Sequence, residues 1–242
     1  MKKYIIAFFL FLFPAYIVRI LLKVIRMRNY TIDKDVKIGF SLILVQELRL
    51  ESGSRIGHLN FIKVKKMIHG GSIGSLNQMR GSFSVITKKH SWIRNGNKFS
   101  ANPETYHDVQ LILKERAAIV VNHIFDMTDN ILIGEGTVIA GSGTQFWTHS
   151  FIVTKKIATG VRIDAPITIG DYCYIGSNCT LLSGVTIANE ITIGAATCVS
   201  KSLKEKGCYV GQGLRFLPFD AEAKIESLGS PKLHNFIFRK DG

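Results

Sequence analysis

An aliphatic side chain recurs at every sixth residue in the second half of the chain. The run is cleanest at Ile169, Ile175, Leu181, Ile187, Ile193 and Val199. A strand alternates its faces with period two and a helix repeats every 3.6 residues, so a period of six indicates short strands separated by turns. Three such sides close a triangular coil of about 18 residues, and successive coils stack with like residues above one another. The pattern therefore predicts a parallel β-helix in which Ile169 lies beneath Ile187.

The same period extends toward the N-terminus with two interruptions. It runs from Ile32 through Leu44 and Ile68, and then continues after a slip of one residue. Residues 88–105 and 150–166 lack the hexad and are expected to be loops. The chain divides accordingly into an N-terminal helix (1–30), a β-helix domain (31–217) and a C-terminal cap or tail (218–242).

The N-terminal helix has a composition of its own. Tyr4 to Val18 is apolar without a break, and Arg19 to Arg28 alternates apolar and basic residues at helical spacing. About 15 uncharged residues are few for a spanning helix, and no small-residue cleavage site follows them. Residues 1–28 are therefore expected to lie at a membrane surface; the alternative is that they are buried within an oligomer.

The charge balance is strongly basic. Lys and Arg number 31 against 18 Asp and Glu, a formal net charge of +13, and no acid occurs between Glu51 and Glu104. Such a surface attracts anions, including phosphorylated cofactors, anionic lipid and diphosphate-linked substrates. No aromatic-basic recognition motif accompanies the charge, so nucleic acid is not an expected partner. Four cysteines do not make a disulfide framework, and Cys173 and Cys179 are expected on adjacent sides of a coil.

Three motifs occur in a fixed order around the second interruption. They are Trp147-Thr148-His149-Ser150, Pro166-Ile167-Thr168-Ile169-Gly170 and Val199-Ser200-Lys201. In this order they resemble the left-handed β-helix acetyltransferases, a family that includes galactoside, maltose and serine acetyltransferases and the capsule and O-antigen O-acetyltransferases. The resemblance is strong from Ile131 to Phe216. It implies an all-β solenoid, a left-handed parallel β-helix of hexapeptide repeats, that forms a homotrimer and uses acetyl-CoA as acyl donor.

The resemblance implies that His149 is the general base. An imidazole with a pKa of about 6.5 can take the proton of a sugar hydroxyl as that hydroxyl attacks a thioester. It also suggests that Asn122, His123 and Asp126 contact the acceptor, together with Trp147 beside the base. The alternative for the first three is that they satisfy a turn.

The resemblance also places acetyl-CoA by position. A tyrosine would lie against the pantetheine, small residues would line its path, and basic residues would bind the adenosine end and its phosphate. These positions are Tyr174, Ser177, Ala195, Ser200, Lys201 and Arg215. Two departures from the family pattern, Gly213 in place of a proline and Pro218 in place of a second basic residue, weaken the match at the adenosine end.

The predicted function is an acetyl-CoA:saccharide O-acetyltransferase of cell-envelope polysaccharide synthesis, at the cytoplasmic face of the membrane. The acceptor would be a saccharide or a lipid-linked saccharide. An N-acetyltransferase on an amino sugar and a non-catalytic scaffold are the alternatives. No metal is expected, because His149 has no second histidine within twenty residues, unlike the zinc site of γ-carbonic anhydrases on the same solenoid.

Overall fold

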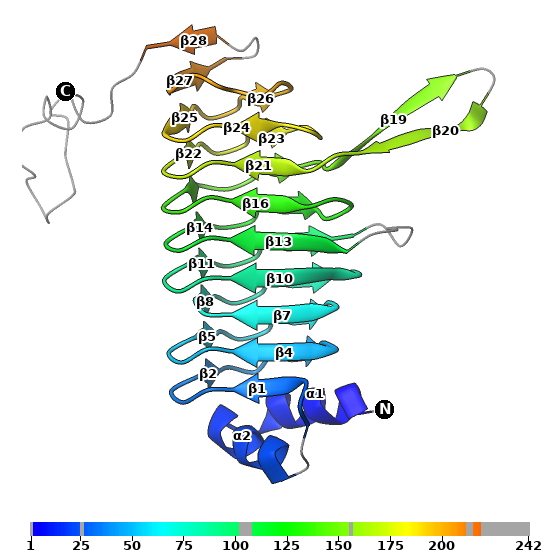
Figure 1. Ribbon diagram of the computed structural model, residues 1–242, viewed down its shortest axis with the longest axis vertical. Helices are drawn as coiled ribbons and strands as arrows, with labels where there is room; N and C mark the ends of the chain where they lie inside the picture. Colours follow the sequence, from blue (N-terminus) through cyan, green and yellow to red (C-terminus); the bar gives the residue numbers. More distant parts are fainter. Residues whose placement is uncertain (1, 25–26, 102–107, 155–156, 212–214, 219–242) are drawn as a thin grey trace, which may run out of the picture.

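The chain forms a tall, left-handed parallel β-helix closed at its lower end by two helices (Figure 1). The computed structural model describes residues 2–24, 27–101, 108–154, 157–211 and 215–218. Each coil contributes one strand to each of three sheets, named A, B and C in chain order. Within these three sheets, described strands pair in parallel except for the last strand, β28, which pairs antiparallel with β27.

The strands are short, and their bounds define the three walls of the solenoid. Sheet A contains β1 (Tyr30–Ile32), β4 (Glu47–Leu50), β7 (Lys66–His69), β10 (Phe83–Thr87), β13 (Val109–Leu113), β16 (Ile131–Ile133), β21 (Ile167–Ile169) and β24 (Thr186–Ile187). Sheet B contains β2 (Lys37–Ile38), β5 (Arg55–Ile56), β8 (Ser72–Ile73), β11 (Trp92–Ile93), β14 (Ala118–Ile119), β17 (Val138–Ile139), β22 (Tyr174–Ile175), β25 (Ile191–Ile193), β27 (Gly207–Val210) and β28 (Arg215–Leu217). Sheet C contains β3 (Leu42–Leu44), β6 (Phe61–Lys63), β9 (Gln78–Arg80), β12 (Lys98–Ser100), β15 (Ile124–Asp126), β18 (Gln145–Phe146), β23 (Thr180–Leu181) and β26 (Cys198–Val199).

The stacking predicted from the hexads is confirmed. Ile169 pairs with Ile187 and Ile175 with Ile193, so like residues lie above one another. The inward side chains are almost fully buried, and they include a stack of three rings, Phe99, Phe125 and Phe146, with centroids 4.5 and 4.3 Å apart. Stacked apolar columns of this kind supply the core that no single coil could bury by itself.

The prediction of a loop over residues 88–105 was wrong for most of that range. Strands β11 and β12 lie within it, with Ile93 and Phe99 buried in the interior. These two residues are six apart, so the six-residue period continues through this range. The polar residues around them in the sequence made the period hard to recognise. Of the predicted C-terminal part, residues 219–242 lie outside the described chain.

Polar side chains also enter the interior, where they form a continuous ladder. Asn77 and Asn97 each donate their backbone N–H to the side-chain oxygen of the asparagine one coil below, at 2.9 Å. The ladder continues upward through His123, whose Nδ1 accepts a hydrogen bond from the backbone N–H of Thr144. Its members, called the interior ladder below, are Ser41, Asn60, Asn77, Asn97, His123 and Thr144. Most polar groups of the ladder thus find a partner in a neighbouring coil, whereas the buried Nε2 of His123 has none among the described residues.

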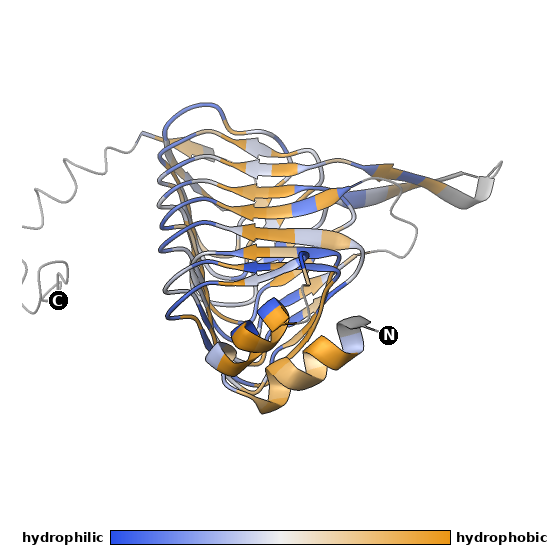
Figure 2. Ribbon diagram, turned by 60° about the horizontal axis from the view of Figure 1, so that its bottom comes forward, coloured by the Kyte–Doolittle hydropathy of each residue, from blue (hydrophilic) through white to orange (hydrophobic). Residues whose placement is uncertain are grey.

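The N-terminal segment forms two helices, α1 (Lys2–Leu12) and α2 (Ala15–Val24), which lie across the first coil (Figures 1 and 2). Pro14 separates them because it has no backbone N–H to continue a helix. Within the described residues, neither these helices nor any other is both long enough and apolar enough to cross a bilayer.

A β-hairpin leaves the solenoid where the second interruption was predicted. Strands β19 (His149–Thr154) and β20 (Ile157–Asp164) pair antiparallel and project as an arm from the upper half of the stack (Figure 1). The predicted loop is therefore an ordered two-stranded excursion, entered and left on the side where sheet C turns into sheet A.

Candidate active site

His149 lies at the base of the arm. The chain leaves β18 in sheet C, passes Trp147 and Thr148, and enters β19 at His149, which pairs with Asp164 at the end of β20. We call this corner of the solenoid, where sheet C turns into sheet A, the C–A edge. The imidazole is partly exposed there, with 23% of its side chain accessible.

The His149 ring is paired with a buried carboxylate. Its Nδ1 lies 2.7 Å from Oδ2 of Asp126, whose side chain is only 8% accessible. A carboxylate can only accept, so Nδ1 carries a proton and donates it. The second ring nitrogen, Nε2, is then unprotonated in the neutral ring and is available as a base. The sequence analysis predicted that Asp126 contacts the acceptor, and in the structure its carboxylate contacts the His149 ring.

The carboxylate of Asp126 is itself held by two threonines. The hydroxyl of Thr128 donates to Oδ1 at 2.6 Å, and the backbone N–H of Thr148 donates to Oδ2 at 2.9 Å. The Thr148 hydroxyl lies 2.8 Å from Oδ2 and accepts from the backbone N–H of Asp129 at 2.9 Å. Several donors to one buried carboxylate stabilise its charge and fix its direction. The orientation of His149 follows from this arrangement.

Aromatic side chains flank the His149 ring. Trp147 and Phe151 both lie edge-to-face with it, with ring centroids 6.4 and 5.5 Å away. Farther along the arm, Phe151, Ile152, Val161 and Ile163 are all more than two-fifths exposed. The arm thus carries an apolar surface that nothing in the described chain covers.

The predicted donor-binding residues lie in the coils above His149 and divide between two edges. Ser200 and Lys201 follow β26 on the C–A edge, two coils above Trp147, and both are exposed. Ser177 and Ala195 occupy successive coils at the corner where sheet B turns into sheet C, the B–C edge. Tyr174 lies next to them on the outer face of sheet B, 48% exposed.

Local backbone geometry leaves room at the B–C edge. Gly141, one coil below Ser177, has φ +64°, and a Cβ built on it would lie 1.8 Å from the Ser177 hydroxyl. A glycine is therefore needed beneath that serine. The side chain of Arg215, the remaining predicted donor contact, lies outside the described residues.

Two of the predicted acceptor residues are placed away from the site. His123 is fully buried in the interior ladder, where burial lowers its pKa to about 4. Asn122 lies at a turn on the B–C edge with φ 56°, a conformation that asparagine tolerates. The turn role that was the alternative for these residues fits both positions. Of the acceptor set, Trp147 and Asp126 are the two that the fold brings to His149.

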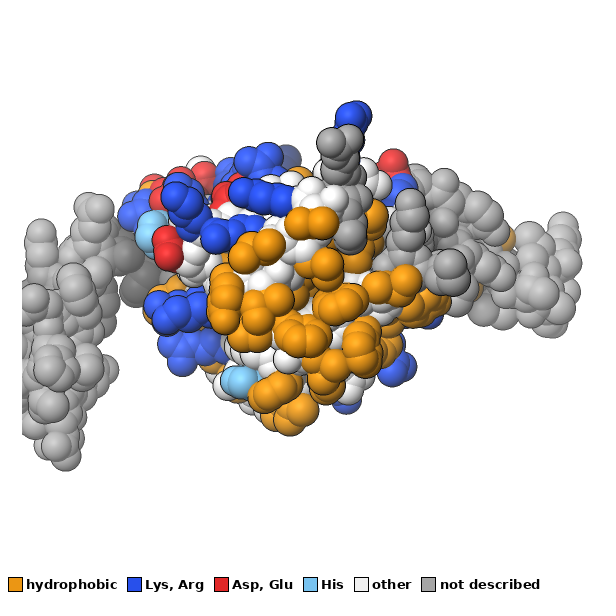
Figure 3. Space-filling view, turned by 90° about the horizontal axis from the view of Figure 1, so that it is seen from below, with side chains coloured by type: hydrophobic (Ala, Val, Ile, Leu, Met, Phe, Trp, Pro, Cys, Tyr) orange, Lys and Arg blue, Asp and Glu red, His pale blue; other side chains and the backbone are white. Residues whose placement is uncertain are grey.

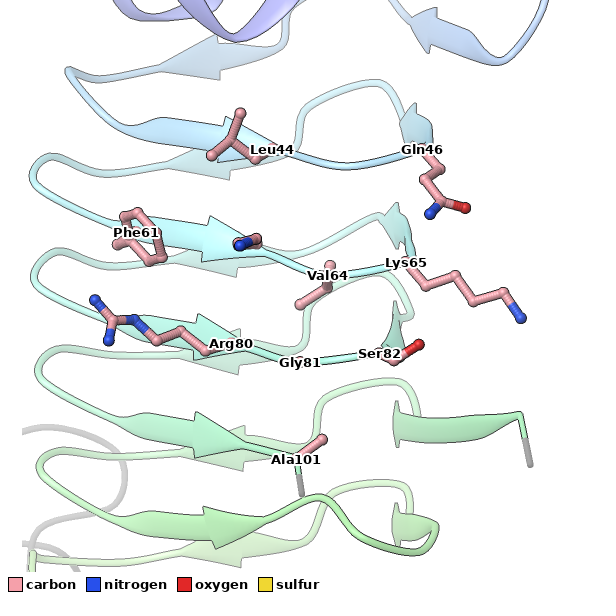
Figure 4. Close-up of a pocket in the computed structure, with 10 residues that line it drawn as sticks. Leu44, Gln46, Phe61, Val64, Lys65, Arg80, Gly81, Ser82 and Ala101 are labelled. Atoms are coloured by element: carbon pink, nitrogen blue, oxygen red, sulfur yellow. The ribbon is translucent and has the colours of Figure 1, made fainter. Parts of the chain in front are cut away.

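A basic hollow lies on the C–A edge, nearer to the helices than His149 is (Figure 4). In register, Lys63 pairs with Arg80, Arg80 with Ser100, and Ser100 with Asp126. At about 4.8 Å per rung, Arg80 is about 10 Å below Asp126 along the wall. The Arg80 guanidinium lies over the Phe61 ring at 4.7 Å, and Lys65 forms an ion pair with Asp108 at the rim. These basic side chains belong to the acid-free stretch between Glu51 and Glu104, whose position in the fold the sequence did not indicate.

The geometry contains no group of three or more His, Cys, Asp or Glu side chains placed to hold a metal, within the part of the chain that the structure describes. The C–A edge holds one oriented imidazole beside an apolar arm, with basic side chains in the coils above and below it.

No family model matches the chain. A UDP-3-O-acylglucosamine N-acyltransferase of Albidiferax ferrireducens is 28% identical over 108 residues, which cover 45% of this chain and 26% of that protein. The chain thus matches about a quarter of the length of this curated relative.

Two solved structures illustrate the similarity. The polysialic-acid-specific acetyltransferase NeuO is 16% identical, with a TM-score of 0.49 over 78% of this chain and 79% of its own. Galactoside acetyltransferase in complex with coenzyme A is 20% identical, with a TM-score of 0.49 over 66% and 74%. The coils themselves establish the architecture: this chain has the hexapeptide-repeat, left-handed β-helix fold that the resemblance implied.

Proposed function

We propose that the protein is an acyl-CoA-dependent O-acetyltransferase that modifies a saccharide hydroxyl, with His149 as general base. The observation that carries the proposal is the 2.7 Å contact between His149 Nδ1 and Asp126, which leaves Nε2 of the neutral, partly exposed ring without a proton. A surface histidine with no role would not need a buried carboxylate held by two threonines.

The chain's own residues account for the proton transfer. Acetyl-CoA, when bound, supplies an acyl group activated as a thioester. Nε2 of His149 takes the proton from the acceptor hydroxyl as its oxygen forms the new ester bond, and the thiolate leaves with the coenzyme. Asp126 stabilises the imidazolium that this step creates, and the proton then returns to the leaving sulfur.

Donor binding is assigned by residue type and position. Tyr174, Ser177 and Ala195 would border the pantetheine, because the two small side chains leave the B–C edge open. Ser200 and Lys201 would meet the adenosine end, where a lysine binds phosphate as a point charge. Arg215 remains a sequence-based candidate for the 3′-phosphate.

A homotrimer is part of this proposal. The base lies on the C–A edge, whereas Ser177 and Ala195 lie on the B–C edge of the same solenoid. A groove between neighbouring solenoids would bring the C–A edge of one copy to the B–C edge of the next. The exposed apolar side chains of the arm would find their cover in that contact.

The acceptor is proposed to be an anionic or lipid-linked saccharide of the cell envelope, reached from the cytoplasmic face of the membrane. The basic hollow below Asp126 supports the charge, since Lys63 and Arg80 lie along the edge that an extended acceptor would follow. Membrane contact through residues 1–28 belongs to the same proposal.

Transfer to an amine is the second candidate. The curated relative is an N-acyltransferase, and an imidazole base would serve an amino group as well as a hydroxyl. The chemical stability of the product distinguishes the two, because an ester is cleaved in mild base and an amide survives.

The test is thiol release from acetyl-CoA by the purified protein, measured against a panel of neutral, acidic and amino saccharides. We expect release with an acidic saccharide, a base-labile product, and loss of activity in His149→Asn. The matched control is His90→Asn, because His90 is exposed and at φ 58°, where asparagine is tolerated. Full activity in His149→Asn would refute the assignment of the base.

A further inference from the structure

Helices α1 and α2, which we call the helical cap, have two apolar faces, and only one of them packs against the solenoid. The inner face packs on the first coil and is buried; it consists of Ile6, Ala7, Leu10, Ala15, Val18 and Leu22. The outer face is equally apolar but exposed; it consists of Tyr4, Ile5, Phe8, Phe11, Leu12, Phe13, Tyr16, Ile17, Ile20 and Val24. We call this second set the outer cap face.

The outer cap face forms one broad surface across the end of the molecule (Figure 3). Val24 is 73% exposed, Tyr16 61% and Phe8 58%. Phe40 of the first coil extends it, with its ring 6.0 Å from Phe11. A contiguous apolar surface of this kind marks a binding face, whereas single exposed apolar side chains are ordinary.

Basic side chains predominate at the border of this face. The first acidic residue of the chain is Asp33, so neither helix contributes a negative charge. Two hollows flank α2. One is lined by Arg19, Lys23 and Arg28, and the other by Arg19, Lys34 and Lys37 together with a single acid, Asp35. Apolar groups in the centre and cations around them fit a bilayer whose headgroups carry phosphate.

We infer that the outer cap face docks end-on onto an anionic bilayer, with the solenoid axis standing away from the membrane. A second copy of the chain is a poorer fit, because two such faces in contact would oppose their basic borders. In a cyclic trimer with parallel solenoids, three caps would meet the same plane, and their combined binding would exceed that of one.

End-on docking sets the height of the base above the lipid. His149 follows β18, the sixth strand of sheet C counted from the cap. Five rungs of about 4.8 Å and one helix layer of about 10 Å put it about 34 Å from the cap face. This consequence rests on the proposed function, in particular on His149 as the base. The hydroxyl that is modified would belong to a saccharide long enough to extend from its lipid anchor past the basic hollow to His149.

Vesicle flotation tests the docking without any need for activity. The probes are phosphatidylcholine vesicles with and without phosphatidylglycerol. The full chain is expected to float with the anionic vesicles, and Phe8→Glu/Ile20→Glu is expected to bind at least about tenfold more weakly, because two large apolar side chains no longer enter the lipid. Leu59→Glu/Leu76→Glu is the matched control, since these leucines are 67% and 58% exposed on the solenoid wall and should not affect binding.

Two tryptophans report the orientation. Trp92 lies on β11, the fourth strand of sheet B from the cap, and Trp147 follows the sixth strand of sheet C. With Trp147→Phe and Trp92→Phe as single-tryptophan forms, end-on docking predicts clearly stronger energy transfer to a headgroup acceptor from Trp92. Equal transfer from the two would mean side-on binding and would overturn the inference.

Other outcomes also count against it. Binding that persists in Phe8→Glu/Ile20→Glu and disappears in salt would assign the interaction to charge alone. A different result would assign the outer cap face to cap-to-cap association. In that case the wild type would not bind vesicles, and its mass in solution would be twice that of Phe8→Glu/Ile20→Glu. Because thiol release with a soluble saccharide should be the same in the variant and the wild type, failure of docking and failure of the proposed activity are separable.

Discussion

The interior of the β-helix and its C–A edge hold polar clusters built from the same kinds of group. In the interior ladder, His123 is fully buried, its Nδ1 accepts from Thr144, and burial keeps its ring neutral. At the edge, Asp126 and two threonines orient His149, and 23% of its side chain remains accessible. The difference lies in exposure and in the partner of Nδ1, so a histidine becomes a candidate base through its placement rather than its presence.

Substituting asparagine for His149 and for His123 should give the largest difference in activity between the edge and the interior. His149→Asn is expected to lower kcat/KM by about 10²- to 10⁴-fold, because general-base catalysis is lost. His123→Asn should keep activity near the wild type, since asparagine already fills this ladder position in the coils below. Thiol-release kinetics together with urea unfolding would measure both. Comparable losses of activity in the two variants would show that the edge is not catalytically distinct.

Asp126→Asn should come next in size, with a loss of about 10²-fold in kcat. The amide can donate toward Nδ1 and thereby favour the ring tautomer in which Nε2 carries the proton. Asp126 is a positioning residue, so the pH–rate profile should change along with the rate. If kcat falls only in proportion to the folded fraction and the profile is unaltered, the role of Asp126 is structural.

Acid should destabilise the interior through His123. Its pKa of about 4 in the folded state lies below the 6.5 of an ordinary histidine, so the unfolded chain binds a proton first as the pH falls. Stability contributed by the neutral ring is present at pH 7 and is lost between about pH 6.5 and 4, amounting to about 2 kcal/mol at pH 5. Urea unfolding of wild type and His123→Asn at pH 7.5 and 5 isolates this contribution. Identical pH dependence in the two proteins would contradict it.

The smallest effect is expected for Thr128→Val. The change removes the 2.6 Å hydrogen bond to Asp126 Oδ1 while keeping the shape of the side chain. A loss of about 1 kcal/mol, or about fivefold in kcat/KM, follows if that bond holds the carboxylate in line with His149. Thr128→Ser, which restores the hydroxyl, serves as the rescue. Equal activity in the valine and serine variants would argue against a positioning role.

The hexad period made the solenoid predictable, but it described the lower coils less well than the upper ones. Leu44 and Ile68 were assigned to the repeat, yet the buried residues are their neighbours Ile43 and Met67. Aliphatic residues occur on both faces of these strands, so the sequence pattern cannot tell which of two adjacent ones points inward. The loop prediction for residues 88–105 was wrong for the opposite reason. There, Ile93 and Phe99 keep the period, but the residues around them in the sequence are polar.

Only the residues of the candidate site that belong to a sequence motif could be predicted. Trp147 and His149 stand in a recognisable order along the chain, and the fold places them side by side at the base of the arm. The partnership of Asp126 with His149 depends on residues 23 apart that the coil brings to one corner. Thr128 and the basic hollow carry no motif at all. Their roles depend on register between coils, which a six-residue period suggests but does not specify for each side chain.

The coils are equally spaced along the solenoid axis, so the number of coils sets the distance of any site from the helical end. Each additional turn of about 18 residues inserted between the cap and β15 would move His149 outward by about 4.8 Å without altering its contact with Asp126. Its working distance from the end could therefore be lengthened or shortened in fixed increments by duplicating or deleting whole turns, leaving its chemistry unchanged.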